Sequence, residues 1–109
     1  MRKEITKTGT IRYFNENNEI LREDGPAIEY SSGTKEWYKN GKLHREGGPA
    51  AEHSDGSKFW YIDGKHHRED GPASEYTDGD KRYLYNNIWY TEIKTDEEWV
   101  RFVKLMVFQ

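Results

Sequence analysis

Apolar side chains in this chain come in short runs that turn residues separate. PAIEY (26–30) and KEWYK (35–39) are each compatible with a β-strand, and the SSGT between them is a turn cluster. Asn40-Gly41 follows the second run, and Asp63-Gly64 takes the same place further along the chain. Both dipeptides are typical of a type I′ hairpin turn, which needs positive φ at two successive residues. The pattern therefore predicts successive β-hairpins.

A 23-residue repeat organises these hairpins. Gly-Pro-Ala recurs at 25–27, 48–50 and 71–73, with an arginine three residues before each glycine and a glutamate two residues after each alanine. A second set keeps the same register: Gly33, Gly56 and Gly79, then Trp37, Trp60 and Tyr83, then Gly41, Gly64 and Asn87. A fixed period of this length indicates a repeat architecture.

The repeat predicts the organisation of the chain as a single domain over residues 1–109. Its parts are a partial repeat (10–24), two repeats (25–47 and 48–70), a divergent last repeat (71–93) and a capping helix segment (95–109). The predicted fold class is all-β with one terminal helix: an elongated antiparallel sheet of tandem hairpins, capped at its C-terminal end.

Aromatic residues are expected to form one row on each face of this sheet. Neighbouring residues of a strand point to opposite faces of the sheet. Trp37 and Tyr38 are therefore expected on opposite faces, and so are Trp60 and Tyr61. Stacked in register, the units would align two rows: Tyr13, Trp37, Trp60 and Tyr83, and Phe14, Tyr38, Tyr61 and Leu84. Large aromatic side chains each bury roughly 150–250 Å², which would stabilise a sheet with few aliphatic residues.

The C-terminal segment predicts a helix from about residue 96 to 108. Thr95 and Glu98 match a capping box. Four residues have the spacing of one apolar helix face: Trp99, Phe102, Val103 and Met106. This stripe predicts a cap over the last hairpin. Further apolar residues widen it (Val100, Leu105, Val107 and Phe108), and from that width we also predict self-association of the helix in a homodimer.

Composition favours a folded chain with a thin core over a disordered one. Hydrophobic residues make up 33% and charged residues 34%, but 17 basic residues nearly balance 20 acidic ones and aromatic residues reach 15%. With a net charge of -3, the chain lacks the basic surface that nucleic acid or anionic lipid requires, so both are disfavoured as partners.

The predicted location is the cytoplasm, or the host cytoplasm if a phage encodes the chain. No apolar run approaches the roughly 18–20 residues of a membrane-spanning helix, and MRKEITKTG lacks the apolar stretch of a signal peptide. The absence of cysteine excludes disulfides, thiolate zinc sites and thiol nucleophiles, and it fits a reducing compartment.

The His-Arg-Glu segment recurs at 44–46 and 67–69 and is the strongest candidate for chemistry. A catalytic centre needs one set of distinct roles, whereas a feature copied in each unit favours stacking of the units. We therefore expect Arg22, Arg45 and Arg68 to form a ladder of ion pairs, interrupted where Gly47 replaces an aspartate. The expected acidic partners are Glu23, Glu46, Glu69, Asp24 or Asp70.

Neither a metal site nor another cofactor is predicted. Two strands per unit would place His44 and His67 about 10 Å or more apart, against bonds of about 2 Å to a shared zinc ion, and His53 is a weaker candidate still. The serines lie in turn clusters, and the sequence has no G-x-S-x-G elbow, so no catalytic residue is assigned.

The segment DGSKFWYIDGKHHREDG (55–71) resembles the MORN repeat, whose units also run for about 23 residues and contain W-x-N-G-K-x-H. Here H-R-E-D-G-P-A replaces the usual H-G-x-G. Tandem copies of this variant resemble repeat proteins of large bacteriophages and giant viruses. The resemblance covers residues 10–93 and implies a curved, elongated sheet of hairpins that serves as an interaction scaffold.

The function expected from these observations is a non-enzymatic protein–protein interaction module. If the chain comes from a phage or a virus, we expect this module to bind and inhibit a host protein. The candidate binding residues are Tyr38, Tyr61, Trp37, Trp60, Arg45, Arg68 and His67. The alternative is a protein that sequesters a small nucleotide-like ligand and binds its phosphate through Arg45 or Arg68.

Overall fold

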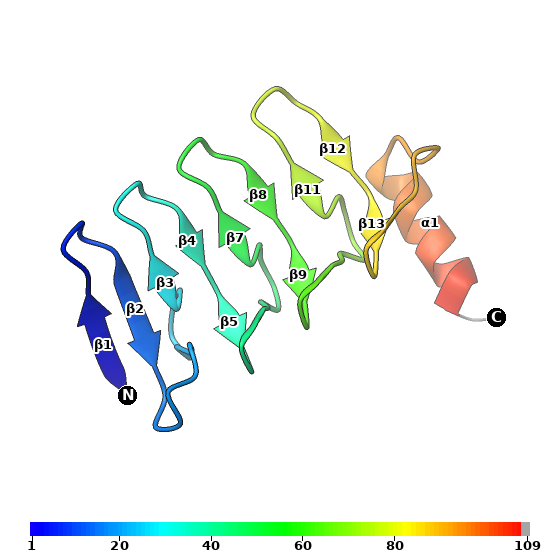
Figure 1. Ribbon diagram of the computed structural model, residues 1–109. Coiled ribbons are helices and arrows are strands. Elements are labelled where there is room, and N and C mark those ends of the chain that lie inside the picture. Colours follow the sequence, from blue (N-terminus) through cyan, green and yellow to red (C-terminus); the bar gives the residue numbers. More distant parts are fainter. Residues whose placement is uncertain (108–109) are drawn as a thin grey trace.

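The computed structural model describes residues 1–107. An eight-stranded antiparallel sheet runs along its length (Figure 1). Its strands, in spatial order, are β1 (Arg2–Ile5), β2 (Ile11–Phe14), β3 (Ile28–Glu29), β4 (Lys35–Glu36), β7 (Ala51–Glu52), β8 (Lys58–Phe59), β11 (Ser74–Glu75) and β12 (Lys81–Arg82). This arrangement confirms the predicted fold class.

Within residues 1–107 three small hairpins extend from this main sheet, one from each unit that follows the partial repeat. They pair β5 (Tyr38–Lys39) with β6 (Lys42–Leu43), β9 (Tyr61–Ile62) with β10 (Lys65–His66), and β13 (Leu84–Tyr85) with β14 (Ile88–Trp89). The predicted turns are confirmed. Asn40 and Gly41 have φ values of 53° and 76°, and Asp63 and Gly64 have 51° and 81°.

The predicted continuous strand at 35–39 is wrong, because it divides at Trp37 into β4 and β5. The Trp37 N–H donates to the Ala50 carbonyl of the next unit at 2.8 Å, whereas its carbonyl accepts from His44 N–H of its own unit at 3.0 Å. The strand therefore changes partners at the tryptophan. Trp60 repeats this exchange with Ala73 and His67.

The structural repeat begins earlier in the chain than the predicted partial repeat 10–24. β1 pairs with β2 over four residues, outside the predicted boundary. The turn between them matches the turn of the next unit, since Thr6 N–H donates to the Thr10 carbonyl as Tyr30 N–H does to Thr34. Gly9, like Gly33, has a positive φ, and it marks this turn in the sequence.

Among residues 1–107, burial is most complete at the repeat alanines of the sheet and in one cluster at its end. The three repeat alanines Ala27, Ala50 and Ala73 are 0% exposed. The end cluster contains Tyr83, Trp99 and Val103. Trp37 and Trp60 are half-buried, so the expected aromatic core is a layer of partly covered rings rather than a sealed interior.

The helix α1 (Asp96–Val107) caps the end of the sheet beyond β12 and β13 (Figure 1). It confirms the predicted helix over the described residues, and Phe108 lies outside them. The Glu98 N–H donates to Thr95 Oγ1 at 3.2 Å, as a capping residue requires. The N-terminal strand and the helix lie at opposite ends of a body that measures 46 × 32 × 19 Å.

Candidate functional site

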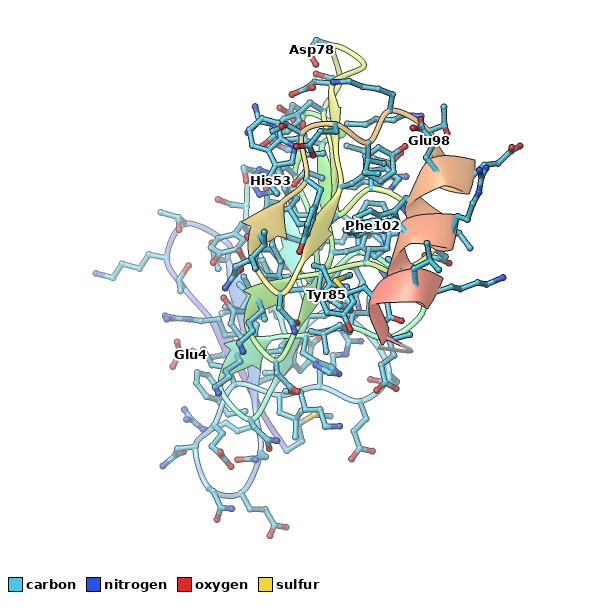
Figure 2. All side chains as sticks on the ribbon, turned by 90° about the vertical axis from the view of Figure 1, so that its right-hand side faces the viewer. Glu4, His53, Asp78, Tyr85, Glu98 and Phe102 are labelled. Carbon is cyan, nitrogen blue, oxygen red and sulfur yellow. The ribbon has the colours of Figure 1, made fainter. Side chains whose placement is uncertain are left out.

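The two faces of the sheet differ in what covers them. With the sheet seen edge-on, α1 and Phe102 lie on one side, whereas His53 and Glu4 lie on the other (Figure 2). We call the first side the arginine face, because it carries the repeated arginines. The second side is the aromatic face, which consists of Tyr30, Tyr38, His53, Phe59, Tyr61, His66, Tyr76 and Trp89. The candidate residues divide between these two faces.

On the arginine face, each repeated arginine lies over an aromatic ring of its own unit. The guanidinium carbon of Arg22 is 4.1 Å from the centre of the Tyr13 ring, and the distances are 4.0 Å for Arg45 over Trp37 and 4.1 Å for Arg68 over Trp60. Such cation–π contacts contribute about 0.5–2 kcal/mol each, depending on burial. The expected row of rings therefore carries a row of cations.

The same guanidinium groups are held from the side by the chain itself. Arg45 donates to the Pro49 carbonyl and Arg68 to the Pro72 carbonyl, each at 3.1 Å. Arg68 also donates to Glu75 at 3.2 Å. These contacts use the donors that a phosphate-binding arginine would offer to a ligand. The sequestering function stays a prediction: Arg68 donates hydrogen bonds to Asp70, Pro72 and Glu75, whereas Arg45 donates one such bond among the described residues, to Pro49.

The predicted ion-pair ladder is confirmed for two aspartates. Arg22 Nε lies 3.0 Å from Asp24, and Arg68 Nε lies 2.9 Å from Asp70. Glu23, Glu46 and Glu69 form no ion pair with these arginines within residues 1–107, so that part of the prediction is wrong. The glutamates that pair with these arginines are Glu29, Glu52 and Glu75, which also follow the 23-residue period but were not predicted as partners.

The repeated histidines join neighbouring units. The Asp63 N–H donates to Nδ1 of His44 at 3.0 Å, and the Asn86 N–H donates to Nδ1 of His67 at 3.1 Å. Because Nδ1 accepts, the proton of the neutral ring is on Nε2, where His67 meets Glu69 at 2.9 Å. His67, predicted as a binding residue, is 8% exposed and holds the turn of the next unit.

On the aromatic face, two tyrosines share one carboxylate. Tyr30 and Tyr38 donate their hydroxyls to the same oxygen of Glu36, at 2.8 Å and 2.9 Å. Burial and the hydrogen bond to Glu36 raise the pKa of Tyr30 to about 12, and the same causes raise the pKa of Tyr38 above its ordinary value. Both hydroxyls therefore remain protonated donors at physiological pH.

The middle of the aromatic face is a cluster of rings around Phe59. Its ring centre lies 4.7 Å from that of His53 and 5.4 Å from that of Tyr76. Beside it, Tyr61 stacks on His66 with 4.3 Å between the ring centres and 15° between the planes. Burial lowers the pKa of His66, and the ring lies 3.3 Å from the Ser74 hydroxyl.

The aromatic face continues into the last unit through Arg82. Its guanidinium carbon lies 4.9 Å from the Tyr76 ring centre and 4.5 Å from that of Trp89. Trp89 is 47% exposed and Tyr30 is 37% exposed, although both belong to residue types that favour burial. The face is therefore ordered by internal contacts and still accessible to another molecule.

The four residues predicted for self-association pack within the chain. Trp99 and Val103 are buried against Tyr83, and Phe102 and Met106 complete the same cluster. The indole N–H of Trp99 donates to the Arg68 carbonyl at 2.7 Å. Dimer formation through this helix stays a prediction, and the apolar helix residues left well exposed for it are Leu105 and Val107.

Metal-ligating and serine–histidine groups are sparse among the described residues. Residues 1–107 contain no group of three or more His, Cys, Asp or Glu side chains that could hold a metal ion. The helix of this part of the chain lacks the length and apolar character needed to cross a membrane. Within residues 1–107 one serine hydroxyl lies within hydrogen-bond distance of a histidine ring, Ser74 beside His66, and Ser74 is 1% exposed.

Comparison with known proteins gave no relative. No protein-family model, no curated protein and no solved structure matches the chain.

Proposed function

We propose that the chain is a non-enzymatic protein-binding module that acts in the cytoplasm and docks its partner on the aromatic face. The observation that carries this proposal is the aromatic face itself, which runs through successive units and remains half-exposed from Tyr30 to Trp89. Tyrosine, tryptophan and arginine dominate the binding energy of protein interfaces, and this face presents all three types.

Internal order on the aromatic face supports docking with a small entropic cost. Tyr30 and Tyr38 are fixed by Glu36, Tyr61 is fixed by stacking on His66, and Arg82 is fixed between two rings. Side chains that are already ordered lose little conformational freedom on binding, which increases the affinity obtained from a given buried area. The arginine face, in contrast, engages its polar groups in contacts between and within units.

The MORN-like resemblance is part of this proposal, since tandem hairpins are compatible with it. If a phage or virus encodes the chain, as that resemblance implies, the partner we propose is a host protein that binding would inhibit. The mixed charge of the aromatic face, with Glu36 and Arg82 among its rings, favours a protein partner over a uniformly charged polymer.

The test compares variants of the two faces as baits in an extract of the source organism. Tyr38→Ala and Tyr61→Ala remove rings from the aromatic face, and Lys58→Ala and Lys81→Ala are matched controls at exposed positions among the strands of the main sheet. Mass spectrometry quantifies what each bait captures, and thermal unfolding shows that each variant is folded.

We expect one captured protein to depend on the aromatic face, with affinity reduced by about tenfold or more in the tyrosine variants, because a lost hot spot costs about 2 kcal/mol or more. The lysine variants should bind like the wild-type chain. Equal capture by all four variants, or equal loss in all four, would contradict the proposal.

A further inference from the structure

One unit departs from the others in the arginine stack. The Nε–H of Arg22 donates to Asp24 at 3.0 Å and that of Arg68 donates to Asp70 at 2.9 Å. Gly47 occupies the equivalent position in the middle unit. The carboxylate nearest to Arg45 among the ion pairs of residues 1–107 is Glu52, 3.9 Å from Nη1. The Nε–H edge of Arg45 therefore lacks the acceptor that its two counterparts have.

Arg45 is nevertheless held in the same orientation as its counterparts. Its guanidinium carbon lies 4.0 Å from the Trp37 ring centre, and Nη1 donates to the Pro49 carbonyl at 3.1 Å. Its side chain is 33% exposed, against 23% for Arg22 and for Arg68. The unit thus presents a fixed cation whose free edge is more accessible than the others.

The space beside this edge is open. A Cβ atom built on Gly47 would meet no atom within 4 Å. A shallow groove of about 420 Å³ lies between the loops of the second and third units, and its lining includes Arg45, Gly47, Pro49, Trp60 and Ile62. Three of these side chains are apolar or aromatic, so the groove offers a cation beside an apolar wall.

Acidic groups also line this groove, and each has a partner within the chain. Asp70 is paired with Arg68 and Glu69 with His67, both at 2.9 Å. Glu46 lies 3.8 Å from His44, and its side chain is 82% exposed. The Nε–H of Arg45 is directed at none of these carboxylates among the described hydrogen bonds.

We propose that Arg45 is a binding site for a carboxylate supplied by another molecule, in the place that Asp24 and Asp70 fill in the neighbouring units. A carboxylate is the chemical class because the chain itself uses that group at both equivalent positions. The wall formed by Trp60 and Ile62 adds a preference for a carboxylate attached to an apolar body. The site belongs to the arginine face and does not depend on the proposed function.

The test follows the Nε–Hε resonances of the three arginines by NMR at constant ionic strength. The probes are acetate, N-acetyl-leucine and inorganic phosphate, with sodium chloride as the balancing salt. We expect the Arg45 resonance to shift saturably with the carboxylates, more tightly with N-acetyl-leucine than with acetate, while Arg22 and Arg68 do not respond. Tighter binding of phosphate than of either carboxylate would overturn the assigned class.

Two variants provide internal controls. Asp70→Gly removes the acceptor of Arg68, so the Arg68 resonance should gain a response like that of Arg45. Gly47→Asp supplies the missing acceptor, so the Arg45 response should be lost. If Gly47→Asp fails to fold because of the positive φ at residue 47, the response of Arg68 in Asp70→Gly alone tests the proposal. A silent Arg45, equal responses of all three arginines, or a silent Arg68 in Asp70→Gly would overturn the proposal.

Discussion

The glycine of each Gly-Pro-Ala segment lies against the guanidinium group of the arginine three residues earlier. A Cβ atom on Gly71 would be 2.8 Å from the Arg68 guanidinium carbon, and one on Gly25 would be 3.1 Å from that of Arg22. The φ angles at these glycines are not in the left-handed region, so the close approach of the arginine explains the residue type. In each unit, the repeated arginine therefore lies between an aromatic ring and the glycine of the Gly-Pro-Ala segment.

We predict that Gly71→Ala lowers the free energy of unfolding by about 0.5–1 kcal/mol, because the flexible Arg68 side chain must move and its cation–π contact with Trp60 weakens. The loss should be smaller for Gly25→Ala, where the clash is weaker. Chemical denaturation of Gly71→Ala, Arg68→Ala and the double variant measures the coupling between the two positions. Because Arg68→Ala removes the clash, Gly71→Ala should cost less in that background, and an equal cost in both backgrounds would refute this explanation.

The half-buried ring of His66 should make the free energy of unfolding depend on pH. Burial lowers its pKa in the folded chain below the ordinary value of 6.5, so the folded state binds the proton less readily than the unfolded state. The contribution of His66 is therefore fully present above pH 6.5 and is lost as the pH falls through the lower folded-state pKa. Leu43 occupies the equivalent position in the preceding unit.

The variant His66→Leu should lose less stability than the wild-type chain between pH 7.5 and pH 5. Denaturant unfolding at a series of pH values measures this difference. Ser74→Ala, which copies Ala51 of the preceding unit, is the matched control because it keeps the titrating ring. If His66→Leu and the wild-type chain show the same pH profile, burial of His66 does not affect stability as described.

At the scale of the elements, the hairpin turns were predictable because two adjacent residues determine them. Asn40-Gly41, Asp63-Gly64 and Asn86-Asn87 all adopt two successive positive φ angles. Asn and Asp tolerate this conformation, whereas other L-residues are disfavoured in it by roughly 1–2 kcal/mol. Local sequence therefore determines where each small hairpin forms.

We predict that Asp63→Ala lowers the free energy of unfolding by about 1 kcal/mol, because alanine is strained at a φ of 51°. Asp63→Asn, which copies Asn40 of the preceding unit, should leave stability within about 0.5 kcal/mol of the wild-type value. Thermal or denaturant unfolding measures the stability of both variants relative to the wild-type chain. Equal destabilisation by alanine and asparagine would show that the side chain, rather than the turn conformation, matters.

The features that sequence did not predict depend on residues far apart in the chain. The division of the strand at Trp37 arises from the Ala50 carbonyl of the next unit, which no local pattern indicates. In the last unit Thr91 replaces the repeated arginine, and Trp99 from the helix packs against Tyr83 with 5.7 Å between ring centres. Strand alternation predicted that Trp37 and Tyr38 lie on opposite faces, whereas the partners that order each face, such as Glu36 for Tyr38, required the structure.

The whole molecule is extended rather than spherical. Its radius of gyration is 15.6 Å, whereas a compact chain of about 100 residues has a value near 13 Å. Each unit bonds to the units next to it through the main sheet and through the repeated histidines. Such a chain is stabilised by contacts between neighbours, which explains how it folds with little fully buried apolar surface.

If contacts between neighbouring units hold the molecule together, a whole 23-residue unit can be removed as long as the register of the remaining units is kept. Deleting residues 48–70 removes one unit and joins Gly47 to Gly71, which preserves the spacing from Arg45 to the next Gly-Pro-Ala. Deleting residues 48–68 is the matched control because it leaves two extra residues and breaks that spacing. Denaturant unfolding followed by circular dichroism is the measurement.

We predict that the chain lacking 48–70 unfolds cooperatively, with a lower free energy of unfolding than the full chain, because one set of neighbour contacts is missing. The chain lacking 48–68 should show no cooperative transition. Loss of cooperative folding in the in-register deletion, or equally stable folding of both deletions, would show that the register between units does not hold the fold together.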